Sequence, residues 1–120
     1  MPTMTDERFE VQGRPEESRY VLIDHEAGDQ VIGEEEYVDV EADDGVQRVL
    51  FHTGVSDDYT GQGLASVLVR AVVDDVIARG YTIVPVCPYV AAWLPKHPEY
   101  ASHVLKPHPQ HLRAVAARTK

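Results

Sequence analysis

Cysteine and long apolar runs are the scarcest features of this 120-residue chain. The single cysteine, Cys87, excludes an internal disulfide framework and is typical of a protein in a reducing cytoplasm. No apolar run approaches the ~20 residues that a membrane-spanning helix needs. The first eight residues contain Asp6 and Glu7 and lack an apolar core, so they do not resemble a signal peptide. We therefore predict a cytoplasmic protein with no membrane partner.

Basic residues are also few: 11 Lys and Arg stand against 20 Asp and Glu, which gives a formal net charge of −9. This balance argues against general nucleic-acid binding, which needs a basic face. The six histidines show no spacing typical of a metal site, so no metal is expected. Seven acids fall between positions 34 and 44, as in the solvated face of a strand, although such a run would also attract a cationic amine. They are Glu34, Glu35, Glu36, Asp39, Glu41, Asp43 and Asp44.

The first third of the chain has the composition of short β-strands. Residues 8–12 alternate apolar and polar side chains, residues 19–24 contain an apolar run from Tyr20 to Ile23, and residues 30–40 are rich in valine, isoleucine and tyrosine. Glycine, proline and acidic turn residues separate the three segments. An antiparallel meander is the simplest arrangement of three such strands. Gly33 inside the third strand predicts a bulge or a close backbone contact.

A strand, a helix and another strand follow. Residues 46–55 are apolar on both faces in the middle, which predicts a buried, central strand, and Gly54 is expected to interrupt its pairing. Residues 61–79 repeat apolar side chains at helical spacing, and Gly80 ends the helix. Residues 81–86 then read as a fifth strand. Because the connection is a helix, the fourth and fifth strands should run parallel.

The chain after the fifth strand is expected to be helical. Pro88 suits the first turn of a short helix, which Pro98 closes. Residues 106–120 are basic and have no acid, and their apolar positions allow either a docked short helix or a frayed tail. Those positions are Leu112, Val115 and Ala116. The expected organisation is a tail at 1–7, one domain at 8–105 and this basic segment.

The segment between the fourth strand and the long helix contains Gly61 and Gly63. Glycine lets the backbone approach a ligand closely, and the start of a helix presents unpaired N–H groups with a partial positive charge. Such a loop suits the phosphates of a cofactor. A tight structural turn would have the same glycines, but the buried strand before it and the helix after it favour the phosphate site.

Three further motifs accompany this loop: His52-Thr53, Pro85-Val86-Cys87-Pro88-Tyr89 and His97-Pro98-Glu99-Tyr100. In this order and spacing, over residues 8–100, they resemble a minimal single-domain branch of the GNAT superfamily of acetyl-CoA-dependent N-acetyltransferases. The resemblance implies an α/β (α+β) fold. Its mixed five-stranded sheet would be an antiparallel meander followed by a parallel β-α-β unit, splayed between strands 4 and 5, with CoA in the gap.

The resemblance also implies which residues hold the co-substrate. They are Val55, Gly61, Gln62, Gly63, Leu64, Ala65 and Tyr89. Two positions depart from the family. Asp58 stands where the family has an Arg or Gln that donates to the pyrophosphate, and Trp93 or Leu94 stands where many members have a tyrosine general acid. The first departure predicts weaker CoA binding. The second leaves the leaving thiolate without its usual proton donor.

Two residues are candidates for catalysis. Cys87 ends the fifth strand and starts a helix, where the pKa of a thiol can be lowered. In the resembled branch it lies close to the CoA thiol, which allows a covalent acetyl-cysteine route beside direct attack by the amine. It could equally be an inert buried cysteine. His52 is either a general base or a hydrogen-bonded structural residue.

The expected activity is acetyl transfer to a primary amine, such as that of a protein lysine or N-terminus. Residues 13–18 are too short for the helices that wall the acceptor site in most of the resembled family. The acceptor side should therefore be open, or completed by another subunit, as in a homodimer. A non-catalytic acyl-CoA-binding module would keep the glycine loop without the catalytic residues, and a plain interaction domain would not bind CoA.

Overall fold

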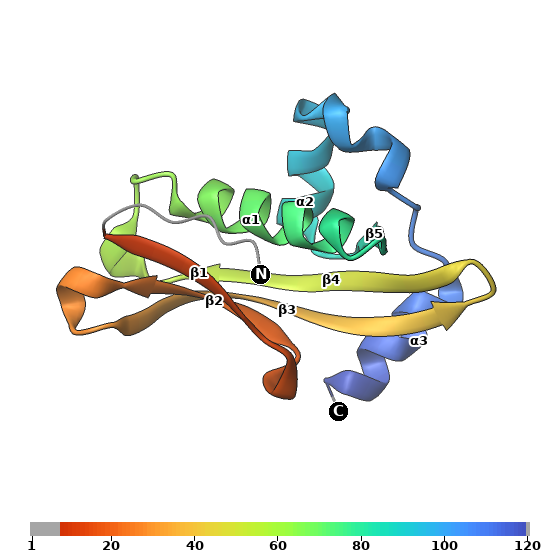
Figure 1. Cartoon of the computed structure of the whole chain (residues 1–120), viewed down its shortest axis with the longest axis horizontal. Helices are drawn as coiled ribbons and strands as arrows, with labels where there is room; N and C mark the ends of the chain where they lie inside the picture. The colour runs from red at the N-terminus through yellow and green to blue at the C-terminus, as the bar shows by residue number, and fades with distance from the viewer. Residues whose placement is uncertain (1–7, 120) are drawn as a thin grey trace.

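The computed structural model describes residues 8–119; the predicted tail at 1–7 and Lys120 lie outside the described residues. A single five-stranded sheet has the order β1-β2-β3-β4-β5 (Figure 1). Its first four strands are antiparallel neighbours, and β5 pairs with β4 in parallel. The strands are β1 (Phe9–Arg14), β2 (Arg19–Asp24), β3 (Gln30–Ala42), β4 (Gly45–Val55) and β5 (Thr82–Pro85). The predicted fold class is confirmed, although β3 rather than β4 is the middle strand.

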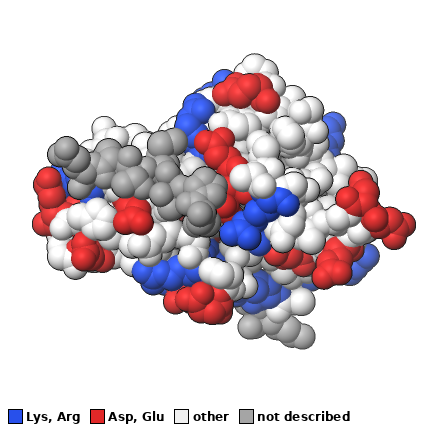
Figure 2. Space-filling view, in the orientation of Figure 1, with Lys and Arg blue, Asp and Glu red and all other residues white. Residues whose placement is uncertain are grey.

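Three α-helices accompany the sheet: α1 (Leu64–Ala78), α2 (Pro88–Trp93) and α3 (Pro109–Arg118). Helix α1 runs along one face of the sheet, and α3 lies against the other (Figure 1). Short 3₁₀ turns connect these elements at Pro15–Glu17, His25–Ala27, Asp57–Tyr59, Leu94–Lys96 and Pro98–His103. In the part of the chain that the structure describes, no helix is long and apolar enough to cross a membrane. Acidic side chains lie at both ends of the face seen in Figure 2, with basic side chains among them.

The core lies between α1 and the sheet. Leu68, Val69, Val72, Val73 and Val76 of α1 are fully buried. The helix was expected to begin at position 61, but α1 begins at Leu64. The reason is that Gly61 and Gly63 adopt left-handed φ angles of +86° and +71°. Gly80, at φ +77°, follows its end.

Two bulges shape the sheet. Leu22 pairs with Gly33 and Ile23 with Val31, so β3 has an extra residue at Ile32, next to the predicted position. A Cβ on Gly33 would come within 3.1 Å of the Gly54 carbonyl oxygen, which explains the glycine.

The bulge of β4 is not at Gly54, where it was expected, because Gly54 pairs regularly with Glu34. It lies at Phe51: Glu36 pairs with His52 and Tyr37 with Leu50, which leaves Phe51 unpaired. An extra residue shifts the alternation of side chains by one. Leu50 and Thr53, three residues apart, therefore both face the helix side, where Leu50 joins the core and Thr53 contacts Cys87.

A polar network centred on the buried Arg48 joins three strands to α1. The Arg48 guanidinium donates to both carboxylate oxygens of Asp39, at 2.8 and 2.9 Å, and to the Tyr20 hydroxyl at 2.7 Å. The Tyr20 hydroxyl donates to Asp75 of α1 at 2.6 Å, and Arg79 donates to the same carboxylate at 2.8 Å. Arg48 is almost fully buried. Each charge in this network has a partner, as buried charges require.

The basic C-terminal segment forms a docked helix, α3, but not on the predicted stripe. Leu112 is 53% exposed. The buried residue is His111, whose ring is hydrogen-bonded to the Gln47 side chain at 2.7 Å. Near its end, Arg118 lies 3.5 Å from Glu36 and over the Phe51 ring. Polar contacts to β3 and β4, rather than an apolar stripe, therefore hold this helix.

Candidate functional site

A small pocket of about 170 Å³ opens where β4 meets the start of α1. Most of the residues expected to hold a phosphate-bearing ligand line it. They are Val55, Gly61, Gly63, Leu64, Ala65 and Tyr89. Gln62 belongs to the same loop but is exposed and does not line the pocket. Tyr89, which comes from α2, is 40% exposed.

The floor of this pocket offers backbone donors. Within residues 8–119, the N–H groups of Gly61, Gly63, Leu64 and Ala65 have no hydrogen-bond acceptor, whereas the Gln62 N–H donates to the Tyr59 carbonyl. A Cβ at Gly61 or Gly63 would meet nothing within 4 Å, so the loop leaves open space above the backbone. Convergent N–H groups at a helix start fit phosphate oxygens.

The loop before the helix is anchored by a buried carboxylate. The Tyr59 hydroxyl donates to Asp24, and Arg8 donates to both Asp24 oxygens at 3.0 Å. The Arg8 guanidinium holds the pKa of Asp24 well below its usual range, so this carboxylate stays ionised as an acceptor. The 3₁₀ turn Asp57–Tyr59, and with it one wall of the pocket, is thereby tied to β2.

β4 and β5 part beyond the residues that line the pocket. Their pairing ends at Leu50 and Pro85, and the Leu50 carbonyl then accepts from the N–H groups of both Val86 and Cys87, at 3.0 and 2.9 Å. Beyond this point β4 runs on to Val55 while the other chain turns into α2. This divergence is the predicted splay.

Cys87 lies at the splay and is buried. Its Sγ is 3.2 Å from the Thr53 hydroxyl, which is also hydrogen-bonded to the Glu35 carboxyl group. Glu35 is fully buried, and burial raises its pKa to about 9. The sequence analysis missed Glu35 because it counted the residue in a solvated acidic run. The available signal was its register, since Gly33, Glu35 and Tyr37 share one face of β3.

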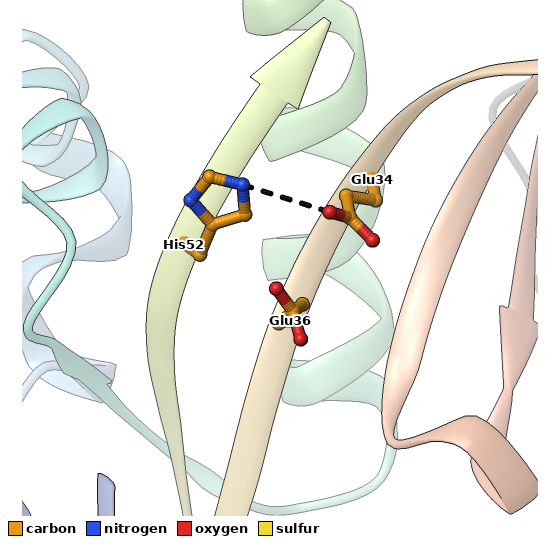
Figure 3. Close-up of side chains that lie close together, drawn as sticks. All are labelled: Glu34, Glu36 and His52. Atoms are coloured by element: carbon orange, nitrogen blue, oxygen red, sulfur yellow. Dashed lines mark ion pairs between the residues drawn. The ribbon is translucent and has the colours of Figure 1, made fainter. Parts of the chain in front are cut away.

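His52 lies on the opposite face of the sheet from Cys87. Figure 3 shows its ring beside Glu34 and Glu36 of β3, with Nε2 3.6 Å from a Glu34 oxygen. The His52 side chain is 49% exposed. The structure therefore does not bring together the two residues expected to act in catalysis. It leaves a solvent-accessible imidazole on one side of the splay and a buried thiol on the other.

The three side chains in Figure 3 have ligand atoms within 4.8 Å of one another, close enough for a cation. Both carboxylates already have a basic partner, however. Arg19 donates to Glu34 at 2.9 Å, and Arg118 lies 3.5 Å from Glu36. The group therefore lacks the excess negative charge that a divalent cation requires.

The position of the expected general acid is apolar. Trp93 and Leu94 are both buried, and the Trp93 indole N–H donates to the Ser66 hydroxyl at 2.8 Å. The nearby Tyr100 hydroxyl is occupied, since it donates to Asp74 at 2.8 Å and accepts from Arg70 at 3.1 Å. Neither Trp93 nor Tyr100 is thus placed to give a proton to a ligand at the splay.

Comparisons with known proteins agree with this geometry. The sequence pattern of the family described as GCN5-related N-acetyl-transferase matches residues 19–104. A GCN5-like candidate N-acetyltransferase from Staphylococcus aureus, solved by NMR, is 25% identical; the similarity covers 88% of this chain and 97% of that one, with a TM-score of 0.60. A ribosomal-protein-alanine N-acetyltransferase from Brucella melitensis biovar Abortus 2308 shares the fold at 17% identity and a TM-score of 0.50, over 87% and 70% of the two chains. No curated protein matches the chain.

Proposed function

The chain belongs to the GCN5-related N-acetyltransferase family, and we propose that it transfers the acetyl group of acetyl-CoA to a primary amine. Membership of this family makes the protein an acyltransferase. Acetyl-CoA as the acetyl donor and a primary amine as the acceptor are our proposal. The observation that carries it is the pocket at the start of α1, where two left-handed glycines present open backbone donors beside the gap between β4 and β5.

We place the pyrophosphate of CoA on the N–H groups of residues 61–65, with Gln62 beside it in the loop. The thioester then runs along β4 from Val55 toward Cys87, under Tyr89. Support for this orientation comes from the pocket itself, since Val55 and Tyr89 line it and each lies two residues from a side chain at the splay. The free edge of β4 beyond Leu50 provides backbone groups for the thioester carbonyl.

Acetyl transfer requires a neutral amine and a way to remove its proton. We assign His52 to this role, directly or through a water molecule, because its exposed ring faces the side of the splay away from the pocket. The amine nitrogen forms the new bond to the acetyl carbon, and the bond to the CoA sulfur breaks. Cys87 lies where the sulfur would be, either as a transient acetyl acceptor or as a group that assists direct transfer.

The acceptor side of the proposed site is open. Between β1 and β2 the chain makes just the 3₁₀ turn Pro15–Glu17, so no helix from this connection covers the sheet. An open side suits a large acceptor such as a protein lysine or N-terminus, or a site completed by a second subunit. A non-catalytic acyl-CoA-binding module is the second candidate, and it differs by binding acetyl-CoA without releasing CoA to any amine.

The first test of this proposal is a Gly63→Trp variant. We expect calorimetry to show micromolar binding of acetyl-CoA to the wild type and a loss of at least about tenfold in the variant, because the indole fills the phosphate pocket. Gly80→Trp is the matched control. Both glycines have left-handed φ angles, +71° and +77°, and open space around a Cβ, so both substitutions strain the backbone alike. Absence of binding to the wild type would refute the proposal.

Asp58 provides a second test, because its exposed carboxylate lies in the turn beside the phosphate pocket. We expect Asp58→Arg to tighten CoA binding about tenfold, which corresponds to ~1.4 kcal/mol, by replacing a repulsive charge with a donor. Asp44→Arg, in the distant turn between β3 and β4, makes the same change of net charge. Equal tightening by both variants would assign the gain to the overall charge, and no change at position 58 would mean that this side chain points away from CoA.

A further inference from the structure

The carboxyl group of Glu35 is an unexplained feature of the helix side of the sheet. Its residue pairs with Tyr20 of β2 and Thr53 of β4, in the interior of the sheet, and is fully buried. Among the described residues no basic side chain forms an ion pair with it, and its Oε2 has no hydrogen-bond partner. An ionised carboxylate in such a place would be very costly, so the group is held in its neutral, protonated form.

Glu35 is joined to a thiol through one hydroxyl. The Thr53 hydroxyl is hydrogen-bonded to the Glu35 carboxyl group, and its oxygen is 3.2 Å from the Cys87 Sγ. A hydroxyl can donate and accept at the same time, and either the hydroxyl or the thiol can be the donor in the second contact. The Thr53 hydroxyl has one proton, which it donates to Glu35 when that group is a carboxylate. A protonated Glu35 instead donates to the Thr53 oxygen, so the Thr53 proton can be donated to Cys87 and the three groups form one continuous chain from the interior to the splay.

The thiol end of this chain lies outside the phosphate pocket, but close in sequence to residues that line it. Thr53 and Cys87 each precede by two residues a side chain that lines it, Val55 and Tyr89. A ligand anchored by its phosphates at residues 61–65 and extended along β4 would bring its far end to Cys87. In acetyl-CoA that end is the thioester.

We propose that Glu35, Thr53 and Cys87 form a proton-donating chain for the sulfur that leaves acetyl-CoA. This inference rests on the proposed function. As the acetyl carbon forms its bond to the amine nitrogen, the bond to the CoA sulfur breaks and the sulfur takes the proton of the Cys87 thiol. Cys87 takes the Thr53 hydroxyl proton, and Thr53 takes the carboxyl proton of Glu35. Glu35 is reprotonated through Thr53 and Cys87 after CoA has left, and the proton of the amine leaves through the base.

The protonation state of Glu35 indicates that the chain donates protons and does not accept them. Burial raises the pKa of Glu35 to about 9, although a hydrogen bond that Thr53 donates to the carboxylate form opposes this shift. The hydroxyl of Tyr20, its neighbour on β2, is instead bonded to Asp75. At neutral pH the Glu35 carboxyl group thus keeps its proton. A protonated Glu35 cannot accept the thiol proton of Cys87 by way of Thr53. The chain therefore assists a leaving thiolate and does not generate a nucleophilic cysteine.

The arrangement also provides a proton donor for the leaving sulfur, which the helix after β5 lacks. Trp93 is packed against Ser66, and the Tyr100 hydroxyl is bound to Asp74, so neither supplies a proton at the splay. A thiolate is a poor leaving group unless it is protonated or stabilised as it departs, and general acid catalysis of this kind contributes ~10²–10⁴-fold. In this protein the proton reaches the sulfur through Cys87, which follows β5, and it comes from Glu35 and Thr53 on β3 and β4.

The test uses the full chain, acetyl-CoA and a lysine-containing peptide, with release of CoA thiol measured from pH 6 to pH 10. We expect Glu35→Gln to lower kcat about 100-fold near neutral pH, with KM and calorimetric binding of acetyl-CoA within about twofold of wild type. The wild-type kcat should fall as the pH rises through about 9, and the Glu35→Gln profile should lack this alkaline limb. Glu41→Gln removes an exposed carboxylate from the same strand and should leave all of these quantities unchanged.

A pair of variants at Thr53 separates proton transfer from packing. Thr53→Val keeps the shape and removes the hydroxyl, so it should lose kcat as Glu35→Gln does; Thr53→Ser keeps the hydroxyl and should restore most of it. Wild-type kcat and an intact alkaline limb in Glu35→Gln, or no rescue by Thr53→Ser, would overturn the proposal. So would an acetyl group on Cys87, found by mass spectrometry after quenching at pH 7.

Failure of the proposed function has a different signature. A wild type that does not bind acetyl-CoA would remove the co-substrate itself. A wild type that binds acetyl-CoA but releases no CoA with the peptide would be a binding module, and with no leaving thiolate the proton-donating chain would be refuted as well. Measurable wild-type turnover combined with unaffected variants would refute the chain and leave the acetyltransferase intact.

Discussion

Asp39→Ala is expected to lower the free energy of unfolding by about 3 kcal/mol, because it removes the charge partner of a buried arginine. Arg48 is almost fully buried, and two of its N–H groups donate to Asp39. Without that carboxylate its charge is left in the interior, next to the Tyr20 hydroxyl and the Tyr37 ring. A domain of this size has ~5–15 kcal/mol of stability in all, so urea denaturation will resolve the loss clearly.

The double variant Asp39→Ala/Arg48→Met separates the effect of the buried charge on stability from the effect of the lost contacts. It removes both charges, so we expect it to be more stable than Asp39→Ala alone. Glu99→Ala is the surface control. Its partner Arg70 is 3.8 Å away and both side chains are exposed, so the change should stay within about 0.5 kcal/mol. A double variant less stable than Asp39→Ala would show that packing of the Arg48 stem, not its charge, dominates.

Glu35→Gln is expected to change how stability depends on pH. The unfolded chain loses the Glu35 proton near pH 4.5, whereas the folded protein keeps it up to about pH 9. Between these values the folded state binds one more proton, so this group makes the wild type less stable as the pH rises, by ~1.4 kcal/mol per pH unit. The glutamine variant has no such dependence. Its stability relative to wild type should therefore rise between pH 5 and pH 8 by on the order of 4 kcal/mol.

Urea denaturation of both proteins at the two pH values measures this difference directly. Because the comparison is between two pH values, a constant cost of placing an amide in the site cancels. Glu41→Gln should show a flat difference, since its side chain is exposed on the same strand. A flat difference for Glu35→Gln as well would mean that the carboxyl group is already ionised in the folded protein at pH 8, and that solvent or a cation reaches it.

The fold could be predicted because local pattern and tertiary structure agree along most of the chain. Residues 19–24 contain a short apolar run bounded by turn residues, and they form β2 with the predicted limits. The apolar repeat of α1 specifies both its length and its buried face. The glycine loop was found for the same reason, since its residues are contiguous and its conformation follows from glycine itself.

The catalytic side of the site was less predictable, because it depends on which face each side chain takes. Simple alternation along β4 puts His52 on the same face as Leu50, toward the helices. One extra residue at Phe51 turns His52 away and brings Thr53 to Cys87. Such a bulge leaves little trace in a single sequence. Glu35 was missed for a related reason: its neighbours Glu34 and Glu36 are on the opposite face, and a run of three glutamates hides the one that is buried.

The opposite orientations of His52 and Thr53 have a consequence for the direction of proton flow. In the proposed reaction one proton leaves the acceptor amine and another enters the departing thiol. Because consecutive residues His52 and Thr53 lie on opposite faces of β4, these two protons travel on opposite sides of the sheet. The proton taken up by the imidazole does not pass directly to the buried carboxyl chain. Each turnover would therefore exchange protons with solvent at two separate places, one for release and one for uptake.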